Sequence, residues 1–161
     1  FAENGYNGTN LRDLAAELGL SKSALYKHYA NKEAIWNALL DRMETYYAER
    51  FGSMENLPKS PESGDELLAM TMKMIDFTVH DERIILTRKL LLTEQFHDER
   101  VCRLASKHFI YGTKNMFAAM FEKMMTDRVM KQDDPEMLAF LYTAPITALI
   151  QLCTREPDKQ E

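Results

Sequence analysis

The segment from Gly19 to Lys32 brings together side chains that can bind phosphate. It holds three lysines, one histidine and no aspartate or glutamate, although residues 1–51 as a whole contain 6 basic and 7 acidic residues. Ammonium, imidazole, phenol and hydroxyl groups all donate hydrogen bonds to phosphate oxygens. A positive charge confined to one short segment favours contact with a nucleic-acid backbone. The charges by themselves are more typical of a solvated helix face, so the spacing of these residues has to decide.

Capping and turn residues around this segment predict three helices. Thr9 or Asn10 can cap a helix that carries an apolar stripe, and Gly19 ends it. Ser21 can cap a second, short helix, and Asn31 a third, longer one. A helix, a tight turn and a second short helix form the layout of a helix-turn-helix motif. The apolar residues that we expect in the core of this unit are Leu11, Leu14, Ala15, Leu18, Leu20 and Leu25.

The same residues resemble the TetR family of transcriptional regulators. Residues 19–33 have the sequence GLSKSALYKHYANKE, which follows almost throughout the family pattern G-[VL]-S-x-x-x-[LI]-Y-x-[HY]-[FY]-x-[NS]-K-E. FAENGY at residues 1–6 is similar to the aromatic and glycine near the end of the family's first helix, and Thr9 to its capping threonine. The resemblance is specific over about residues 1–45 and architectural beyond them. It implies that most of the first helix precedes Phe1 and that a final helix follows residue 161.

The resemblance also implies which residues contact DNA. Tyr26, His28 and Lys32 correspond to contacts with backbone phosphates, and Lys32 lies in a first helical turn, where free amides add to an anion site. Side chains exposed on the second helix would meet base edges, where lysine can bind guanine and a small apolar side chain can contact a thymine methyl group. Tyr29 is expected to pack inward. The predicted DNA-binding set is Thr9, Ser21, Lys22, Ser23, Ala24, Tyr26, Lys27, His28 and Lys32.

The remainder of the chain predicts longer helices after a loop. Residues 53–64 contain two prolines and end on Gly64, which indicates a linker. Helical periodicity then predicts elements at 64–80, 81–96, 98–131 (with a break near Gly112) and 135–154. With only 6 glycines and 5 prolines in the chain, this pattern predicts an all-α fold. By analogy with the family, residues 1–51 would form a helix-turn-helix DNA-binding domain, and residues 52–161 a larger helical ligand-binding and dimerisation domain.

The tetrapeptide His-Asp-Glu-Arg occurs twice, at residues 80–83 and 97–100. An aspartate at a helix cap and a glutamate in the first turn suit the free amides and the dipole of a helix start. A metal site would need further ligands at helical spacing, and neither copy has a second histidine there. We therefore expect two helix starts, no metal and no cofactor.

The uncharged residues after Glu136 predict a helix that needs partners on more than one side. The stretch is just long enough to cross a membrane, but polar residues interrupt it and no basic cluster flanks it, so we expect a helix packed by protein. Pro145 should kink or notch this helix. A second copy of the chain would supply a partner, although the same leucines could be ordinary core. The predicted dimerisation stripe is Leu138, Leu141, Tyr142, Pro145, Leu149 and Leu152.

The chain contains 11 methionines, and several cluster in the helices predicted at 64–80 and 98–131. Methionine adapts to irregular apolar shapes, which suits a hydrophobic ligand, but the same property makes it a common core residue. No charged group stands out as an anchor for a ligand. The residues that we expect to line an effector pocket are Met74, Phe77, Phe96, Tyr111, Met116, Phe117, Met120 and Tyr142.

These features predict a cytoplasmic, homodimeric repressor that a small, hydrophobic effector releases from a palindromic operator on double-stranded DNA. The alternatives are a dimeric DNA-binding regulator without an effector, and a helix-turn-helix unit that docks on protein instead of DNA. We expect no enzyme, because the chain has no Gly-rich phosphate loop, no HExxH and no GxSxG motif. Two cysteines, Cys102 and Cys153, are too few for a disulfide framework, which is typical of a reducing compartment.

Overall fold

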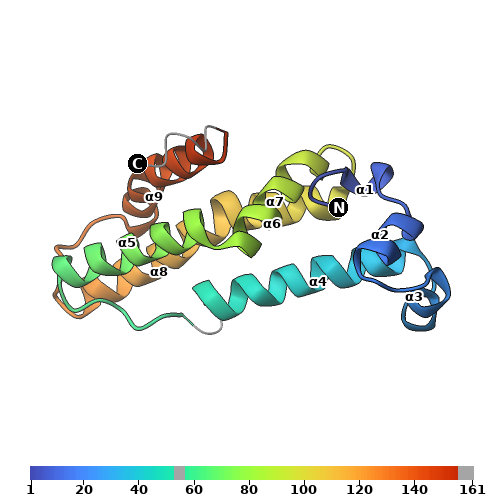
Figure 1. The fold of residues 1–161 in the computed structure, drawn as a ribbon. Helices are drawn as coiled ribbons and strands as arrows, with labels where there is room; N and C mark the ends of the chain where they lie inside the picture. Colours follow the sequence, from blue (N-terminus) through green and yellow to red (C-terminus); the bar gives the residue numbers. More distant parts are fainter. Residues whose placement is uncertain (53–56, 156–161) are drawn as a thin grey trace.

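The computed structural model describes residues 1–52 and 57–155, and every element in this part of the chain is helical (Figure 1). In chain order the elements are α1 (Gly5–Gly8), α2 (Leu11–Glu17), α3 (Lys22–His28), α4 (Lys32–Phe51), α5 (Gly64–His80), α6 (Glu82–Glu94), α7 (Glu99–Ser106), the π-helical turn η1 (Lys107–Tyr111), α8 (Gly112–Thr126) and α9 (Pro135–Arg155). Helices α1 to α3 gather at one end, and α4 leads from them along the larger body. The all-α class predicted from the sequence is confirmed.

Polar caps and one glycine begin and end the helices at the N-terminal end. Asn10 caps α2 by accepting two backbone N–H bonds of 2.9 Å. Ser21 caps α3 through a bond of 3.1 Å, and Asn31 caps α4 through a bond of 2.8 Å. Gly19, at φ +63°, has the left-handed conformation that glycine adopts at little cost. The N–H groups of Gly19 and Leu20 bond back to the last turn of α2 at 3.0 and 2.8 Å, which closes the tight turn before α3.

The core of this helix-turn-helix unit holds fewer leucines than predicted. Ala15 and Leu25 are buried, with 2% and 5% of their surface exposed. Leu18 and Leu20 are 59% and 44% exposed, so their prediction as core residues is wrong. Both flank Gly19, where the chain reverses direction at the surface, and they therefore point away from the face that α2 and α3 share.

Two clusters of buried side chains hold the helices together. The first joins α5, α8 and α9, and consists of Leu67, Phe117, Ala118, Met120, Phe121, Met124, Met125 and Ala139. The second joins α4, α6 and α7, and consists of Trp36, Leu40, Leu90, Leu91, Val101, Leu104 and Ala105. Because α4 contributes to the second cluster, the helix that follows the helix-turn-helix unit is built into the larger body.

Both His-Asp-Glu-Arg copies begin a helix, as predicted. Asp81 accepts the Ile84 N–H to cap α6, and Asp98 caps α7 in the same way. Each aspartate also accepts a hydrogen bond from an aromatic side chain of α4. The Tyr46 hydroxyl donates to Asp81 at 2.9 Å, and Trp36 Nε1 donates to Asp98 at 2.9 Å. The repeated sequence therefore begins two helices and fastens α4 to both of them.

The long helix predicted at 98–131 forms three elements, and its C-terminal end is five residues shorter than expected. α7 passes into the π-helical turn η1, and α8 then runs from Gly112 to Thr126. The Gly112 N–H bonds to the Lys107 carbonyl oxygen, and a Cβ atom on Gly112 would lie 2.6 Å from that oxygen. Instead of the predicted break near Gly112, the structure has a π-helical turn within continuous helix. A glycine fits at this position because a Cβ atom would meet the Lys107 carbonyl oxygen.

We expect Gly112→Ala to destabilise the protein, although the same change inside an ordinary helix stabilises it by about 0.5–1 kcal/mol. The added methyl group would have to displace the Lys107 carbonyl, and overpacking of this kind costs about 1–3 kcal/mol. Thermal unfolding should show a fall of several degrees in the midpoint. Gly64→Ala is the control, because no atom lies within 4 Å of a Cβ there. Equal stability of the two variants would contradict the prediction.

Candidate functional site

Helix α3 turns most of its polar side chains toward solvent. Leu25 packs inward and Ala24 is half-buried. The exposed residues on α3 and its cap are Ser21, Lys22, Ser23, Tyr26, Lys27 and His28. The Lys22 ammonium lies 5.6 Å from the centre of the Tyr26 ring, within range of a cation–π contact. This surface offers hydroxyl, phenol, imidazole and ammonium donors with no carboxylate of its own, so it suits an extended polyanion.

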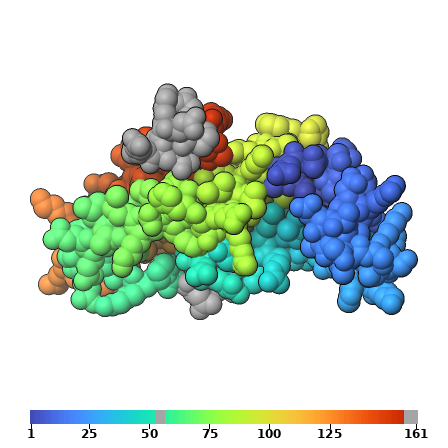
Figure 2. All heavy atoms as spheres, in the orientation of Figure 1, coloured from blue at the N-terminus to red at the C-terminus, as the bar shows by residue number. Residues whose placement is uncertain are grey.

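The helix-turn-helix unit lies at one end of the molecule, where its surface is open to a large partner (Figures 1 and 2). Lys32, in the first turn of α4, is half-buried, and its ammonium lies 4.4 Å from the centre of the Tyr6 ring. Thr9 lies apart from the exposed group. It is 8% exposed, and its hydroxyl donates to the Gly5 carbonyl at 2.7 Å, because α1 ends there and Asn10 takes the capping position.

Helix α9 exposes a long apolar face. Its large exposed side chains are Met137, Phe140, Leu141, Leu149 and Leu152, which are between 47% and 62% exposed, and Pro145 lies among them. Of the predicted dimerisation stripe, Leu138 and Tyr142 instead pack on the core cluster of α5 and α8. Sequence reasoning missed Met137 and Phe140. The helical repeat could have indicated them, because Met137 lies four residues before Leu141 and Phe140 lies three residues after Met137.

The length and composition of α9 would allow it to cross a membrane, and 11% of the apolar window is buried. One such helix is weak evidence for a membrane span, because a helix that docks on protein has the same composition. Among the described residues, one side of α9 packs on α5 and α8, and large apolar side chains on its other side are exposed. The predicted partners on more than one side are therefore not supplied by this part of the chain, and a second copy stays a prediction.

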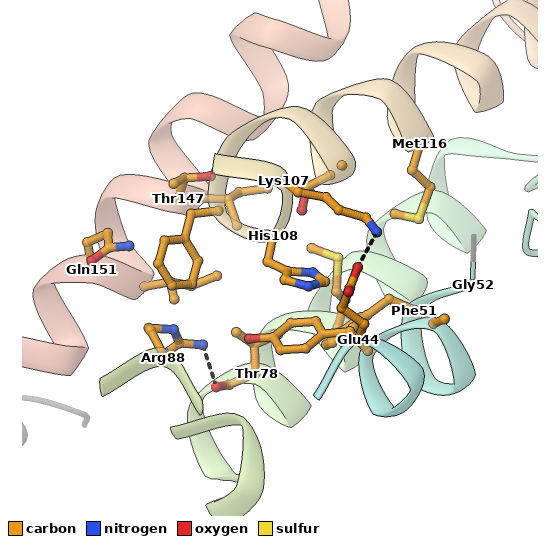
Figure 3. A pocket seen from close by; sticks show the side chains of 18 residues that line it. Glu44, Phe51, Gly52, Thr78, Arg88, Lys107, His108, Met116, Thr147 and Gln151 are labelled. Atoms are coloured by element: carbon orange, nitrogen blue, oxygen red, sulfur yellow. Dashed lines mark hydrogen bonds and ion pairs between the residues drawn. The ribbon is translucent and has the colours of Figure 1, made fainter. Parts of the chain in front are cut away.

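A cavity of about 410 Å³ lies between α4, α5, α6, η1, α8 and α9 (Figure 3). Its lining consists of Glu44, Tyr47, Ala48, Phe51, Gly52, Met74, Thr78, Arg88, Lys107, His108, Phe109, Gly112, Thr113, Met116, Ile146, Thr147, Ile150 and Gln151. The volume is in the range of small-molecule sites, and the lining combines apolar side chains with a few polar ones, as such sites do.

Two of the eight predicted pocket residues, Met74 and Met116, line this cavity. Phe117, Met120 and Tyr142 belong to the core around α8, and the Tyr142 hydroxyl is hydrogen-bonded to Thr71 at 2.8 Å. Phe77 lies behind the lining, where its ring packs on Phe51 with centres 5.6 Å apart. Phe96 and Tyr111 are 83% and 59% exposed. Aromatic type and helical spacing alone do not show which face of a helix will border a cavity.

The polar groups of the cavity are the ones that sequence reasoning missed. Arg88 is 3% exposed, and it bonds to the Thr154 hydroxyl at 3.0 Å and to the Thr78 carbonyl at 2.9 Å. His108 Nε2 and Gln151 Oε1 are buried without a hydrogen-bond partner among the described residues. The signal for Arg88 is its place in an apolar run, since residues 84–92 have the sequence IILTRKLLL. A charged residue on the inward stripe of such a helix calls for a specific partner.

Burial shifts the pKa values of two side chains that line the cavity, His108 and Tyr47. It lowers the pKa of His108 to about 4, and the Lys107 ammonium acts in the same direction. Burial also raises the pKa of Tyr47 to about 12. His108 is therefore neutral at pH 7, and its ring stacks on that of Tyr47 with centres 4.1 Å apart. Lys107 and Glu44 form an ion pair of 2.9 Å, so that these two charges balance each other at one edge of the cavity.

Lowering the pH from 6.5 to 4 is expected to destabilise the folded protein through His108. The unfolded chain takes up this proton near the ordinary pKa of 6.5, whereas the folded chain does so only near 4. The unfolded state thus binds more protons across this range, and the stability present above pH 6.5 falls by up to about 3 kcal/mol as the pH drops. Urea unfolding of the wild type and of His108→Phe at pH 7 and pH 4.5 measures the effect. An identical loss of stability in both proteins would assign the pH dependence to other groups.

The helix-turn-helix residues match a known family of proteins. Residues 1–39 match the family model described as "Bacterial regulatory proteins, tetR family". The chain is 33% identical over 104 residues to an uncharacterised HTH-type transcriptional regulator of Bacillus subtilis, YerO, a match covering 62% of this chain and 33% of the relative. It is 37% identical over 49 residues to IcaR of Staphylococcus epidermidis, the HTH-type negative regulator of the biofilm operon, with 30% of this chain and 26% of IcaR covered. The chain thus spans about a third or less of these curated relatives.

The fold as a whole has a solved counterpart. The structure of a Clostridium perfringens protein proposed to regulate fatty acid metabolism superimposes with a TM-score of 0.68 over 100% of this chain and 84% of that chain. At 18% sequence identity the two share the fold.

Proposed function

On the premise that residues 1–39 match the family model of tetR-type bacterial regulatory proteins, we propose that this chain is a homodimeric transcriptional repressor of the TetR family. In this proposal α3 binds a palindromic operator, α9 forms the dimer interface, and a small effector in the cavity releases the DNA. The observation that carries the proposal is the exposed face of α3, which collects phosphate and base donors at one end of the molecule.

DNA binding accounts for the composition of α3 better than a solvated surface does. Lys22 and Lys27 supply two cations on one short helix, and Tyr26 lies between them with 45% of its surface exposed. Since nearly half of this side chain meets solvent, its hydroxyl can donate to a phosphate. Lys32 and the free amides at the start of α4 extend the same anion-binding surface. Leu25 anchors the helix from behind, so the donors keep a fixed spacing.

A dimer through α9 accounts for the apolar face on that helix. Three leucines, one methionine and one phenylalanine are exposed between Met137 and Leu152, over about four helical turns. They form an apolar patch of the kind that marks a protein interface. A two-fold axis would pair this face with itself and place two α3 helices on one side of the dimer. Two such helices fit half-sites about 34 Å apart in successive major grooves, and this spacing requires a palindromic operator.

Effector control follows from the position of α4. Its C-terminal half lines the cavity through Glu44, Tyr47 and Phe51, and its first turn follows α3. A 20-residue helix is about 30 Å long and stiff, so a small rotation at the cavity is carried to the DNA-binding end. Because coupling is reciprocal, a ligand that favours one spacing of the two α3 helices changes operator affinity, and DNA changes ligand affinity by the same factor.

Repression, a cytoplasmic location and the lack of catalysis belong to the same proposal. IcaR, which the N-terminal residues match, is named a negative regulator. Regulators of this family act on chromosomal DNA, which in bacteria lies in the cytoplasm. We assign the cavity to ligand binding, with no reaction.

The test is DNA binding by the full protein to labelled fragments of its own upstream region. Fluorescence anisotropy should give a dissociation constant that weakens steeply with salt, because each neutralised phosphate releases counterions. A duplex carrying both half-sites should bind far more tightly than one carrying a single half-site. Salt-independent binding would favour a unit that docks on protein, and equal affinity for whole and half sites would overturn the dimeric arrangement.

The alternative without an effector is tested in the same assay. A panel of small molecules is first screened by thermal shift, and each stabilising compound is then added to the protein–DNA complex. Release of DNA by a compound that also raises the unfolding temperature supports effector control. If the protein binds DNA but no compound releases it, the alternative without an effector is favoured. In that case α9 would serve dimerisation and the cavity would have no regulatory role.

A further inference from the structure

The cavity contains a buried cation that has no anionic partner in the described part of the chain. Arg88 is 3% exposed, and its guanidinium donates hydrogen bonds to two neutral oxygens, the Thr154 hydroxyl and the Thr78 carbonyl. Tyr47 and Cys153 also interact with it electrostatically. Arginine remains protonated in proteins and carries five N–H donors. None of the ion pairs between described residues includes Arg88. A buried charge left in this condition is costly, and an anion that enters the cavity would relieve the cost.

Further unsatisfied groups lie beside this cation. Gln151 precedes Thr154 by three residues on α9, so the two share a helix face, and Thr154 bonds directly to Arg88. The side-chain oxygen of Gln151 and Nε2 of His108 are both buried without partners among the described residues. In Figure 3, Arg88 and Gln151 lie at one end of the cavity, Met116 and Phe51 at the other, and His108 between them.

Each of these groups can donate to an oxygen of a ligand. A Gln carboxamide can turn either its oxygen or its NH₂ group toward a ligand. The neutral His108 ring donates when its proton is on Nε2. Tyr47 contacts two of these groups: its ring stacks on His108, and its phenol interacts electrostatically with Arg88. The polar end of the cavity is therefore a set of donors around one fixed positive charge.

The remainder of the cavity is apolar and adds no net charge. Phe51, Met74, Met116, Ile146 and Ile150 line it. Lys107, the other cation at the wall, is paired with Glu44 at 2.9 Å. One unbalanced positive charge suits a singly charged ligand, because a dianion would bring in a second charge without a partner. The flat guanidinium fork matches the two oxygens of a carboxylate.

We propose that this cavity binds an apolar monocarboxylate, with its carboxylate on Arg88 and Gln151 and its hydrocarbon body between Met74, Met116 and Ile150. The inference rests on the proposed function only in taking the cavity as the effector site, because binding itself is measurable without DNA. Arg88 connects α5 and α9 through Thr78 and Thr154. A carboxylate bound to Arg88 would therefore act on the contact between α9, which carries the proposed dimer face, and α5, which packs on α4 through Phe77 and Phe51.

The test compares three probes with the same decyl chain: decanoate, decanol and decyltrimethylammonium, each below its micelle concentration. Isothermal titration at pH 7.5 should show wild-type protein binding decanoate about 10- to 100-fold more tightly than decanol, the range expected for one charge-assisted contact. The cationic probe should not bind in the cavity. Equal binding of decanoate and decanol, or binding of neither, would overturn the proposal.

Arg88→Met is the decisive variant, because it keeps the length of the side chain and removes the charge. It should lose the preference for decanoate and bind decanol at least as tightly as the wild type does, a gain that a misfolded protein cannot give. Lys89→Gln, on the exposed side of the same helix, should keep the wild-type preference. If Arg88→Met fails to fold, Gln151→Leu is tested instead. The proposal would be contradicted if that variant preferred decanoate over decanol as strongly as the wild type does.

Adding operator DNA separates this inference from the proposed function. If decanoate bound through Arg88 but did not release DNA, the proposed anion site would be supported, and control of DNA binding by this class of ligand would be refuted. If decanol released DNA and decanoate did not, the proposed effector-controlled repressor would be supported, and the proposal that Arg88 binds a carboxylate would be refuted.

Discussion

A Leu141→Glu, Leu149→Glu double variant is expected to be a folded monomer that no longer binds its operator. Leu141 and Leu149 are 60% and 62% exposed in the single chain, so glutamate there meets water and should not unfold it. In a dimer through α9, four carboxylates would be buried without partners, at a cost of several kcal/mol each. Sedimentation or light scattering should give the monomer mass, and operator binding should fall below detection.

The matched control for this variant is Leu18→Glu, which changes a similarly exposed leucine (59%) in the helix-turn-helix unit, away from α9. It should remain a dimer. Circular dichroism and unfolding midpoints close to wild type would establish that the double variant is folded. A double variant that stays dimeric would move the interface away from α9 and leave its apolar face without an explanation.

The second large effect is expected from Lys22→Ala combined with Lys27→Ala. A lysine that meets a base edge in the major groove contributes about 1–3 kcal/mol, so the double variant should bind DNA about 100-fold more weakly at moderate salt. Its salt dependence should also be shallower, because two cations that displace counterions from the DNA are lost. Both measurements come from fluorescence anisotropy titrations at a series of salt concentrations.

Lys73→Ala combined with Lys89→Ala is the control for net charge. Both lysines are exposed, on α5 and α6, and their loss changes the total charge of the protein by the same amount. Operator affinity should change little, since these side chains lie on the larger body and not on α3. If the two double variants weakened binding equally, general electrostatics rather than the α3 surface would govern the affinity.

The local features of this chain were predictable because residues three or four positions apart decide them. Asn10, Ser21 and Asn31 cap their helices through bonds to amides in the next turn, and Gly19 closes α2 by adopting a positive φ. The apolar stripe that exposes Leu141 and Leu149 follows in the same way from the helical repeat. The choice between Thr9 and Asn10 for one cap depended on where α1 ends, which needed the structure.

The cavity was not predictable, because its walls come from six elements that are distant in the sequence. Methionines and aromatics at helical spacing look the same whether they face a core or a cavity, and for this reason the sequence pattern does not separate Met120 and Phe117 from Met116. A break near Gly112 was expected, but the π-helical turn and its close approach to the Lys107 carbonyl appear only in the structure.

By itself the sequence determined the helical class, the helix-turn-helix unit with its donors, and the apolar stripe of α9, since each depends on contacts within a few turns of one helix. Only the tertiary structure decided what Arg88, His108 and Gln151 are. Three polar residues spread over α6, η1 and α9 come together around one cavity because the packing of α4 and α8 between them leaves a space that no side chain fills. Burial then made Arg88 a cation without an ion-pair partner among the described residues and His108 a neutral donor, and neither property exists in the unfolded chain.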